Sequence, residues 1–538
     1  MIRTLALLAA MCLTLAEART PKLIISIIVD DLGAHDLGHT NGDQIRTPAF
    51  SRLRAEGLAL SRLYVQPICT PTRSSFLTSR LALALGMQGK QTIQQGCPWG
   101  LDLGEQTFVE ALQGAGWRTA MVGKAHIGGD YWRRTPTYRG FDSFIGYYYG
   151  AEDYYTHTLG NFYDLRNDTA PRCGPGCSRA IGSAHNGTYS PYLFAAEVIR
   201  HIAAAAASPQ PTFIYFAPQS VHAPKEAPQE FVQPYVAQFG PQNPWRAVHA
   251  GALACLDAAL ANITAAIAAA GLAEDALIFV NADNGGPLGD TGDGTMASNY
   301  PLRGGKHSLY EGGVRAVGLV WGPGILGPSP PNATWEGLAH ITDLGPTLLE
   351  AAGVAPLPPH PGRPVHGQSF WQALLARQPP RRGSVVVNVD YTTPMPQAAL
   401  VRADGMKLIV GGAGDDTCNY WSDPVGLPET PPPGQVGGGG HSKAPSAHSV
   451  LGSGLLQLAP PPFWPLADMT LTLYNLTEDP RETRNLTQAL PDVAAELLAE
   501  LAVWGSTAAV PVAENPTPDP ASNPGRYWNG SWTPWRGV

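Results

Sequence analysis

One stretch of the sequence decides the fold: Lys22-Leu-Ile-Ile-Ser-Ile-Ile-Val29, followed at once by Asp30-Asp31. A short run of β-branched residues that ends in polar side chains is typical of a strand buried on both faces of a parallel sheet. The pattern recurs at 212–216, before His222, and at 276–280, before Asp283-Asn284. Helical segments are expected near 49–57, 104–116, 191–207 and 247–270. This alternation predicts an α/β fold with a large mixed, mostly parallel sheet sandwiched by helices.

The chain divides into a leader, two domains and a tail. Residues 1–18 are interpreted as a signal peptide, because Arg3 precedes an apolar core that ends at the cleavage pattern Ala16-Glu17-Ala18. The large domain spans 19–376. A smaller α+β domain spans 384–510, with strands at 385–390, 399–410 and 469–476 and a helix at 491–504. The insertion 423–463 contains Pro-Pro-Pro and Gly-Gly-Gly-Gly runs and is expected to be flexible, and 511–538 is expected to pack as an extended tail.

Composition and charge exclude several classes of protein. Charged residues make up 14% of the chain and the net charge is −8, which is unlike the basic footprint of a nucleic-acid-binding protein. After the signal peptide, no apolar run is long enough to predict a membrane span. Seven Asn-x-Ser/Thr sequons follow the signal peptide. They indicate a glycoprotein of the secretory pathway, either extracellular or in a lysosome-like compartment.

The cysteines leave several alternatives open. Cys12 leaves with the signal peptide, and Cys69 lies in a motif discussed below. Among the remaining five, the pair in Cys173-Gly-Pro-Gly-Cys177 could close a small loop, whereas Cys255 in an Ala-rich helical stretch is interpreted as a buried free thiol. A zinc site on Cys173 and Cys177 is disfavoured because no second ligand pair has the expected spacing.

Hard oxygen ligands follow two of the predicted strands. Asp30 and Asp31 come directly after the first strand, and Asp283 and Asn284 follow the third. Adjacent carboxylates at a buried strand end repel each other unless a cation or protons intervene. Three carboxylates and an amide favour Ca²⁺, which takes six to eight oxygen ligands, over Mg²⁺. The alternative is that these residues only cap loops.

A cysteine is expected near the start of a helix in Cys69-Thr-Pro-Thr-Arg73. Proline is favoured at the first position of a helix, where free N–H groups and the dipole attract anions. Arg73, one turn on, is expected on the same face as Cys69. The stretch therefore indicates chemistry on a charged oxyanion, with a buried or disulfide-bonded cysteine as the alternative.

Four further side chains are candidates for binding an anion or moving a proton. Lys124 and His126 are separated by one residue after an apolar strand, His222 follows the second strand, and Lys306 lies in a glycine-rich segment. A histidine whose pKa is near neutrality can protonate a leaving alcohol, and a lysine can bind anionic oxygens. Taken as an isolated pair, Lys124 and His126 could also be a solvated lysine and an ordinary surface histidine. Taken alone, His222 is more often a loop histidine, and His307 beside Lys306 adds ambiguity.

Several segments together resemble the sulfatase family. Cys69-Thr-Pro-Thr-Arg73 with Leu77-Thr-Ser-Arg80 is similar to the first sulfatase signature, and Gly116-Trp-Arg-Thr…Gly123-Lys-Ala-His-Ile-Gly128 to the second. Within the family the likeness is greatest to the arylsulfatase B branch, the N-acetylgalactosamine-4-sulfatases. The segments that carry this likeness include Glu152-Asp-Tyr-Tyr-Thr-His157, Gln219-Ser-Val-His222, Ala282-Asp-Asn-Gly-Gly286, Glu311-Gly-Gly-Val-Arg315, His340-Ile-Thr-Asp343 and Asp479-Pro-Arg-Glu482. The departures are Thr72 for the usual Ser, Ser79 for Gly and Ala125 for Trp.

The resemblance implies a mechanism. Cys69 would be oxidised to formylglycine by a formylglycine-generating enzyme, and the hydrated aldehyde would attack the sulfur of a sulfate ester. One Ca²⁺ would be held by Asp30, Asp31, Asp283, Asn284 and the modified Cys69. Arg73, Lys124 and Lys306 would neutralise the sulfate oxygens, His222 would protonate the leaving alcohol, and His126 would take the proton that expels sulfate. The substrate would be a sulfated carbohydrate or a small aryl sulfate. The alternatives are a phosphatase or phosphodiesterase of the same superfamily and an inactive glycan-binding relative.

Overall fold

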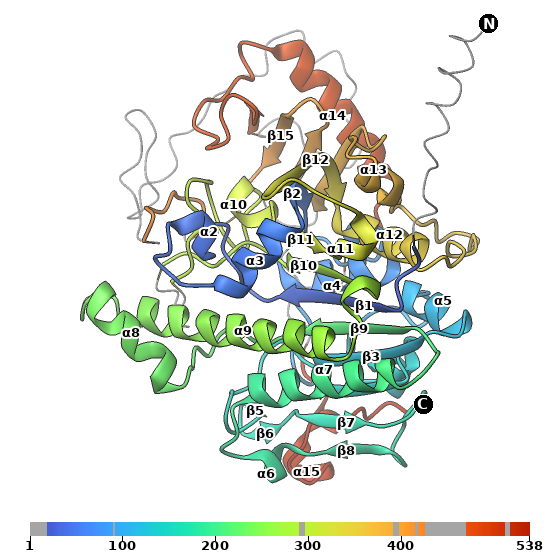
Figure 1. Ribbon diagram of the computed structural model, residues 1–538. Helices are drawn as coiled ribbons and strands as arrows, with labels where there is room; N and C mark the ends of the chain where they lie inside the picture. Colours follow the sequence, from blue (N-terminus) through green and yellow to red (C-terminus); the bar gives the residue numbers. More distant parts are fainter. Residues whose placement is uncertain are drawn as a thin grey trace, which may run out of the picture.

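A ten-stranded mixed sheet forms the centre of the molecule in a computed structural model (Figure 1). The structure describes residues 19–89, 92–289, 296–390, 397–414, 418–425, 470–511 and 517–537. The predicted signal peptide and nearly all of the predicted insertion therefore lie outside the described residues. In sheet order the strands are β12 (Ala333–His340), β2 (Leu58–Tyr64), β11 (Gly318–Trp321), β10 (Ala276–Ala282), β1 (Leu23–Val29), β9 (Thr212–Ala217), β3 (Arg118–Lys124), β4 (Ser143–Tyr147), β7 (Arg166–Asp168) and β8 (Ser178–Ala180).

Strand β1 lies between two parallel neighbours, as its unbroken apolar run predicts. All seven of its residues are buried. In register, Val29 of β1 is level with Ala282 of β10, and β9 and β3 run parallel beside them. The mostly parallel character of the sheet is confirmed, with β11, β7 and β8 as antiparallel members. Because the four central strands end at one edge of the sheet, the polar residues that follow them meet there.

Helices cover both faces of the sheet. In Figure 1, α7, α8 and α9 lie on one side, and α4, α5 and α12 pack together on the other. The helices of the large domain are α2 (Gly38–Asn41), α3 (Pro48–Glu56), α4 (Cys69–Thr78), α5 (Phe108–Gly114), α6 (Gly182–His185), α7 (Ser190–Ala206), α8 (Gln229–Phe239), α9 (Pro244–Ala269), α10 (Glu311–Val314), α11 (Pro323–Leu326), α12 (Leu344–Ala351) and α13 (Trp371–Leu375).

Two of these helices qualify the expectations from sequence. The helix expected near 104–116 begins only at Phe108, because Thr107 and Glu110 form a capping box: each side chain accepts a hydrogen bond from the other residue's backbone N–H. Helix α9 is long and apolar enough to cross a membrane, but more than half of its most apolar window is buried inside the protein. It packs against α7 and α8, so it is a core helix of the sandwich.

The smaller domain carries a four-stranded antiparallel sheet with one long helix. Its strands are β13 (Ser384–Asp390), β14 (Gln397–Arg402), β15 (Met406–Gly411) and β16 (Leu471–Asn475), and its helix is α14 (Pro491–Ser506). The single strand expected at 399–410 is two strands, because Ala403 to Gly405 form a turn in which Gly405 has a φ of 91°. The predicted α+β character of this domain is confirmed.

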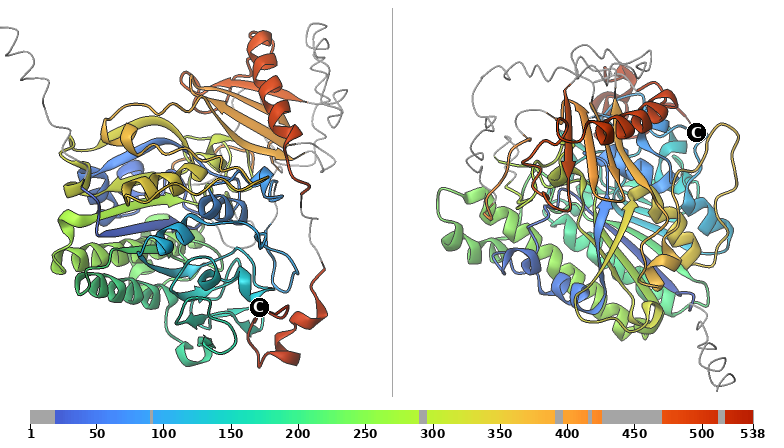
Figure 2. Two further views of the ribbon diagram at one scale, coloured as in Figure 1. Left: turned by 90° about the vertical axis from the view of Figure 1, so that its right-hand side faces the viewer. Right: turned by 90° about the horizontal axis from the view of Figure 1, so that it is seen from above.

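The C-terminal tail returns to the large domain (Figure 2). It is not wholly extended, since α15 (Pro524–Tyr527) lies within it. Trp532 donates its backbone N–H to the Tyr163 carbonyl in β6 (Phe162–Tyr163), which pairs with β5 (Thr158–Leu159), and its side chain joins the main core. The tail therefore covers the part of the large domain farthest from the small sheet.

Two of the cysteine interpretations are decided by the structure. Cys173 and Cys177 form a disulfide, which closes the small loop that their spacing suggested. Cys255 in α9 is a buried free thiol, as expected.

Candidate active site

The three strands that carry polar ends bring their side chains together. Asp31 donates its backbone N–H to Asp283 Oδ1 over 3.3 Å, and Asn284 Nδ2 donates to Asp31 Oδ1 over 2.8 Å. Ligand atoms of Asp30, Asp31 and His222 lie within 4.8 Å of one another. Asp31 has a φ of 60°, a left-handed conformation that is uncommon outside glycine and that occurs at functional sites. The ends of β1, β9 and β10 thus form a single buried cluster.

Helix α4 brings the predicted nucleophile to the same edge. Strand β2 runs in the same direction as β10, so the chain leaves it at the carboxyl edge and enters α4 at Cys69. Every residue of α4 is buried. Pro71 stands at the third helical position rather than the first, which the first turn tolerates. Burial raises the pKa of the Cys69 thiol, and the charges of Lys124 and Lys306 act on it in the opposite direction.

Three cations are paired with the three carboxylates. Lys124 Nζ lies 2.5 Å from Asp30 Oδ2, and Lys306 Nζ lies 2.7 Å from Asp31 Oδ1. Arg73 donates through Nε and Nη2 to Asp283 Oδ2, over 3.1 and 2.8 Å. Burial alone would raise the pKa of Asp30, but the charge of Lys124 above all holds it well below its usual range. The cluster therefore combines balanced charges with almost no contact with solvent.

The donor set fits a hard divalent cation. Asp30 Oδ1 and Asn284 Oδ1 are both buried and have no hydrogen-bond partner. Burial, followed by the charge of Asp30, raises the pKa of Asp283 to about 7, so this carboxylate would gain from a further positive charge. Unpartnered oxygens from carboxylates and an amide are the ligands that Ca²⁺ prefers. His222 also lies close, but its nitrogen does not match an all-oxygen site.

His222 presents one nitrogen to the cluster. Its Nδ1 lies 2.5 Å from the Ala223 carbonyl, to which it donates, and its Nε2 lies 3.8 Å from Asp31 Oδ2. Burial, and secondarily the charges of Lys306 and Lys124, lower the pKa of His222 to about 4. The charge of Asp30 acts in the opposite direction, towards a higher pKa. Negative charge brought by an anionic substrate would offset the two lysines and raise the pKa of His222.

His126 lies beside the start of α4. Its Nε2 is 3.0 Å from Thr70 Oγ1 and 3.1 Å from the Ile93 carbonyl, whereas its buried Nδ1 has no partner. Burial and the charge of Lys124 hold the pKa of His126 well below its usual value, so the ring is neutral. Ala125, where the resembling family has Trp, is buried between Lys124 and His126. All of the site residues expected from the sequence thus lie around this edge of the sheet.

Three residues at the site were not predicted from the sequence. Tyr215 accepts a hydrogen bond from Arg73 Nη1 over 3.2 Å, and Tyr154 donates to the His222 carbonyl over 2.9 Å. Lys225, three residues beyond His222, is 6% exposed and lies 2.5 Å from His249 Nδ1. Tyr154 lies in the segment Glu152-Asp-Tyr-Tyr-Thr-His157 and Lys225 in a polar loop, but nothing in either segment predicts the contact of Tyr154 with His222 or that of Lys225 with His249.

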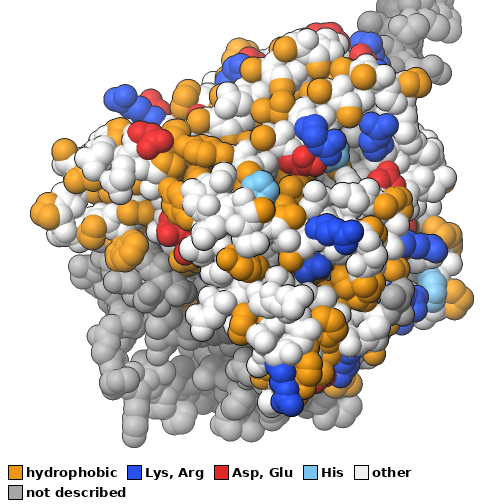
Figure 3. All heavy atoms as spheres, turned by 90° about the horizontal axis from the view of Figure 1, so that it is seen from below, with side chains coloured by type: hydrophobic (Ala, Val, Ile, Leu, Met, Phe, Trp, Pro, Cys, Tyr) orange, Lys and Arg blue, Asp and Glu red, His pale blue; other side chains and the backbone are white. Residues whose placement is uncertain are grey.

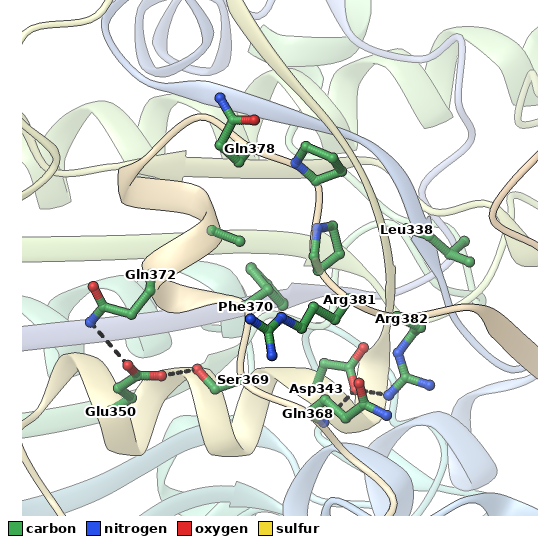
Figure 4. A pocket seen from close by; sticks show the side chains of 13 residues that line it. Leu338, Asp343, Glu350, Gln368, Ser369, Phe370, Gln372, Gln378, Arg381 and Arg382 are labelled. Atoms are coloured by element: carbon green, nitrogen blue, oxygen red, sulfur yellow. Dashed lines mark hydrogen bonds and ion pairs between the residues drawn. The ribbon is translucent and has the colours of Figure 1, made fainter.

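A separate pocket of about 500 Å³ lies away from this cluster, between α12, α13 and the link to the small domain (Figure 4). Figure 4 shows Arg382 paired with Asp343, and Glu350 held between Ser369 and Gln372. None of the candidate site residues lines it. On the face seen from below, Lys and Arg side chains stand in separate groups rather than in one continuous patch (Figure 3).

Comparisons of the sequence identify its relatives. The family model described as Sulfatase matches residues 22–354. Arylsulfatase J of Mus musculus is 32% identical over 97% of this chain and 81% of its own length. Arylsulfatase A of Homo sapiens is 29% identical over 92% of this chain and 89% of its own length. The N-acetylgalactosamine-6-sulfatase of Mus musculus is 28% identical over 65% of this chain and 66% of its own length.

Solved structures share the fold at lower identity. The crystal structure of Ps i-CgsB has a TM-score of 0.71 and 20% identity, and the match covers 93% of this chain and 96% of that chain. The structure of BT4656 in complex with its substrate D-glucosamine-2-N,6-O-disulfate has a TM-score of 0.62 and 15% identity, with 91% of this chain and 98% of that chain covered. Both matches include the large and the small domain.

Proposed function

Because the chain belongs to the sulfatase family and is a sulfuric ester hydrolase, we propose that its nucleophile is a formylglycine made from Cys69. One observation carries the proposal. Cys69 begins a wholly buried helix at the sheet edge where three cations and three carboxylates are gathered. When converted to the hydrated aldehyde, residue 69 would supply a hydroxyl for attack on sulfur and a second hydroxyl whose deprotonation releases sulfate.

A calcium ion is the cofactor that the cluster fits. Asp30, Asp31, Asp283, Asn284 and the modified residue 69 would hold it. The ion would supply a positive charge that orients the sulfate and lowers the pKa of the attacking hydroxyl. The unpartnered oxygens of Asp30 and Asn284 support this assignment.

The remaining steps fall to side chains of the chain itself. Arg73, Lys124 and Lys306 bind the sulfate oxygens, where negative charge is concentrated in the transition state. His222 takes up a proton at Nε2 once the charge of the bound sulfate raises its pKa, and it gives that proton to the leaving oxygen. Its Nδ1–H is already donated to the Ala223 carbonyl. His126, neutral and with an unpartnered Nδ1, accepts the proton that expels sulfate from residue 69.

The substrate is proposed to be a sulfated sugar or a small aryl sulfate. The names of the relatives support this choice, since two are arylsulfatases and one is an N-acetylgalactosamine-6-sulfatase. We place the protein in the secretory pathway, where a formylglycine-generating enzyme would act on it during maturation. Five of its sequon asparagines are exposed: Asn186, Asn262, Asn332, Asn485 and Asn529.

Mass spectrometry of residue 69 tests the proposal. The protein is produced with a formylglycine-generating enzyme, and the tryptic peptide 63–73 is examined for the mass loss of thiol-to-aldehyde conversion. Sulfate release is measured on nitrophenyl sulfate and on a sulfated N-acetylgalactosamine, with nitrophenyl phosphate as the comparison ester. Cys69→Ala should lower sulfate release at least about 10³-fold without unfolding the protein. Full activity with an unmodified Cys69 would contradict the proposal.

A further inference from the structure

The imidazole of His222 depends on its loop for its position. Its one close contact is to the carbonyl of the next residue, Ala223, so the side chain is fixed only as firmly as the backbone of that loop. On the N-terminal side the loop is held, because Tyr154 donates to the Gln219 and His222 carbonyls and Val221 donates its N–H to the Asp30 carbonyl. On the C-terminal side, Tyr189 donates to the Glu226 carbonyl over 2.8 Å.

Lys225 supplies a contact on that side. Its amine is buried, and it lies 2.5 Å from His249 Nδ1 in α9. His249 Nε2 lies 3.0 Å from Asp36 Oδ2. A carboxylate at this nitrogen favours the tautomer with hydrogen on Nε2, which leaves a lone pair on Nδ1 to accept from the lysine. The three side chains therefore form one directional series, from Lys225 through His249 to Asp36.

Asp36 is itself rigidly held and belongs to the loop of the calcium ligands. It lies five residues after Asp31. Its Oδ1 accepts from Arg246 Nη1 over 2.6 Å and from the Ser298 N–H over 3.0 Å, and its Oδ2 accepts from the Gly33 N–H over 3.0 Å. Asp36, Arg246 and His249 are all fully buried. The link between His249 Nε2 and Asp36 Oδ2 is an ion-pair contact at 3.0 Å rather than a hydrogen bond. A series of buried polar groups in such contact transmits position, because displacement of one member leaves its neighbour without a partner.

We propose that Lys225 is a positioning residue, which through His249 and Asp36 braces the His222 loop against the loop of Asp30 and Asp31. This inference rests on the proposed role of His222 as proton donor. The brace keeps His222 Nε2 at the distance from the cluster at which a leaving oxygen would be protonated. Lys225 itself needs no contact with the substrate.

The dependence of rate on the leaving group separates this role from a merely structural one. The kcat/KM is measured for a series of substituted phenyl sulfates that runs from good to poor leaving groups, with enzyme normalised to its aldehyde content. A good leaving group departs without a proton, whereas a poor one needs His222. In Lys225→Met, kcat/KM for the substrate with the best leaving group should stay within about threefold of wild type. For the poorest leaving group kcat/KM should fall about tenfold, which is part of the 10²–10⁴-fold acceleration that a general acid contributes.

Two comparisons sharpen the test. The double variant Lys225→Met/His222→Ala should be no worse than His222→Ala alone, because a positioning residue has no effect once the group it positions is gone. Lys407→Met is the matched control, since Lys407 is also a buried, paired lysine but lies in the small domain. It should not change the leaving-group dependence. If Lys225→Met does not fold, His249→Leu removes the same contact from the other side and should steepen the dependence equally.

Three outcomes would overturn the inference. One is an equal loss of kcat/KM on every substrate in the series, and another is additive losses in the double variant. The third is a raised KM confined to substrates with a second negative charge, which would make Lys225 a substrate contact. Failure of the proposed function looks different, because wild-type protein with aldehyde at residue 69 would then release no sulfate at all.

Discussion

At the scale of single residues, burial controls the chemistry of the site. His222 and His126 are both kept neutral by desolvation and by neighbouring cations, so neither carries charge until something anionic arrives. Two asparagine side chains near the end of β10 differ in whether they contact the carboxylates. Asn281 and Asn284 both have a buried, unpartnered Oδ1, but only Asn284 contacts Asp31. Asn284, the amide beside the carboxylates, is therefore the one expected to bind calcium.

Removal of the Asn284 oxygen should therefore weaken calcium binding. In wild-type protein, treatment with a calcium chelator should abolish sulfate release, and added Ca²⁺ should restore it and raise the melting temperature, since a ligand stabilises the state that binds it. Asn284→Ala should need at least about tenfold more Ca²⁺ for the same rise in melting temperature. The matched control is Asn281→Ala, which should keep the wild-type calcium dependence. An equal effect of the two variants would argue against the assigned ligand set.

At the scale of elements, helix α4 shows how a departure from the family pattern is accommodated. The helix ends at Ser79, where the sulfatase signature has Gly, and Ser79 has a φ of 57°. Such left-handed C-caps favour glycine because a Cβ is strained there. The Ser79 hydroxyl is also buried without a partner, while its carbonyl accepts from the His366 and Gly367 N–H groups. Ser79 therefore has two features that are unfavourable for stability, a strained backbone conformation and a buried hydroxyl without a partner.

Glycine at position 79 should stabilise the protein. Ser79→Gly removes the strained Cβ and the unpartnered hydroxyl, which stabilises the folded state. Part of this stabilisation is offset because glycine gives the unfolded chain more conformational freedom. The expected increase in the free energy of unfolding is about 1 kcal/mol. Ser79→Ala removes the hydroxyl alone and should give a smaller increase. Denaturant unfolding of the three proteins measures both effects, and a Ser79→Gly protein less stable than wild type would show that the serine fills space the helix end requires.

At the scale of the whole molecule, a buried ion cluster joins the two domains. Lys407 in β15 lies 2.9 Å from Glu311 Oε1 of the large domain and 2.9 Å from Glu482 Oε1 of the small one. Glu482 Oε2 accepts the Glu311 N–H over 2.6 Å, and Tyr64 donates to Glu311 Oε2 over 3.0 Å. Buried Lys407 thus faces two buried carboxylates, and Arg315, which is partly exposed, lies 3.8 Å from Glu311 Oε2. Burial, with the charge of Glu311 added to it, raises the pKa of Glu482 to about 7.

This cluster predicts a pH dependence of stability. The pKa of Glu482 is higher in the folded protein than its ordinary value of 4.5. The folded state therefore binds the proton more tightly, and the resulting stabilisation is complete below pH 4.5 and is lost as pH rises through 7. The melting temperature of wild-type protein should fall between pH 5 and pH 8 relative to that of Glu482→Gln, which mimics the protonated form. Parallel pH profiles for the two proteins would contradict this account.

Much of the fold was predictable because its signals are local. The apolar runs at 22–29, 212–216 and 276–280 form β1, β9 and β10. A short unbroken apolar run is stable where both of its faces are buried, as in a central strand of a parallel sheet. The convergence of Asp30 and Asp283 also followed, because parallel strands end at one edge. The predictions for the start of α5 and for a single strand at 399–410 were wrong. The spacing of apolar residues does not show where a capping box begins a helix or where a turn of three residues interrupts a strand.

The sequence by itself determined the three central strands β1, β9 and β10, the meeting of their ends and the family. Only the tertiary structure decided which charge pairs with which carboxylate, how far the pKa of His222 falls, and that Lys225 reaches His249. The reason is physical. Strand direction and side-chain alternation are properties of neighbouring residues, whereas desolvation and ion pairing depend on groups far apart in the sequence, such as Lys306 and Asp31, which are 275 positions apart. Such contacts exist only once the chain has folded.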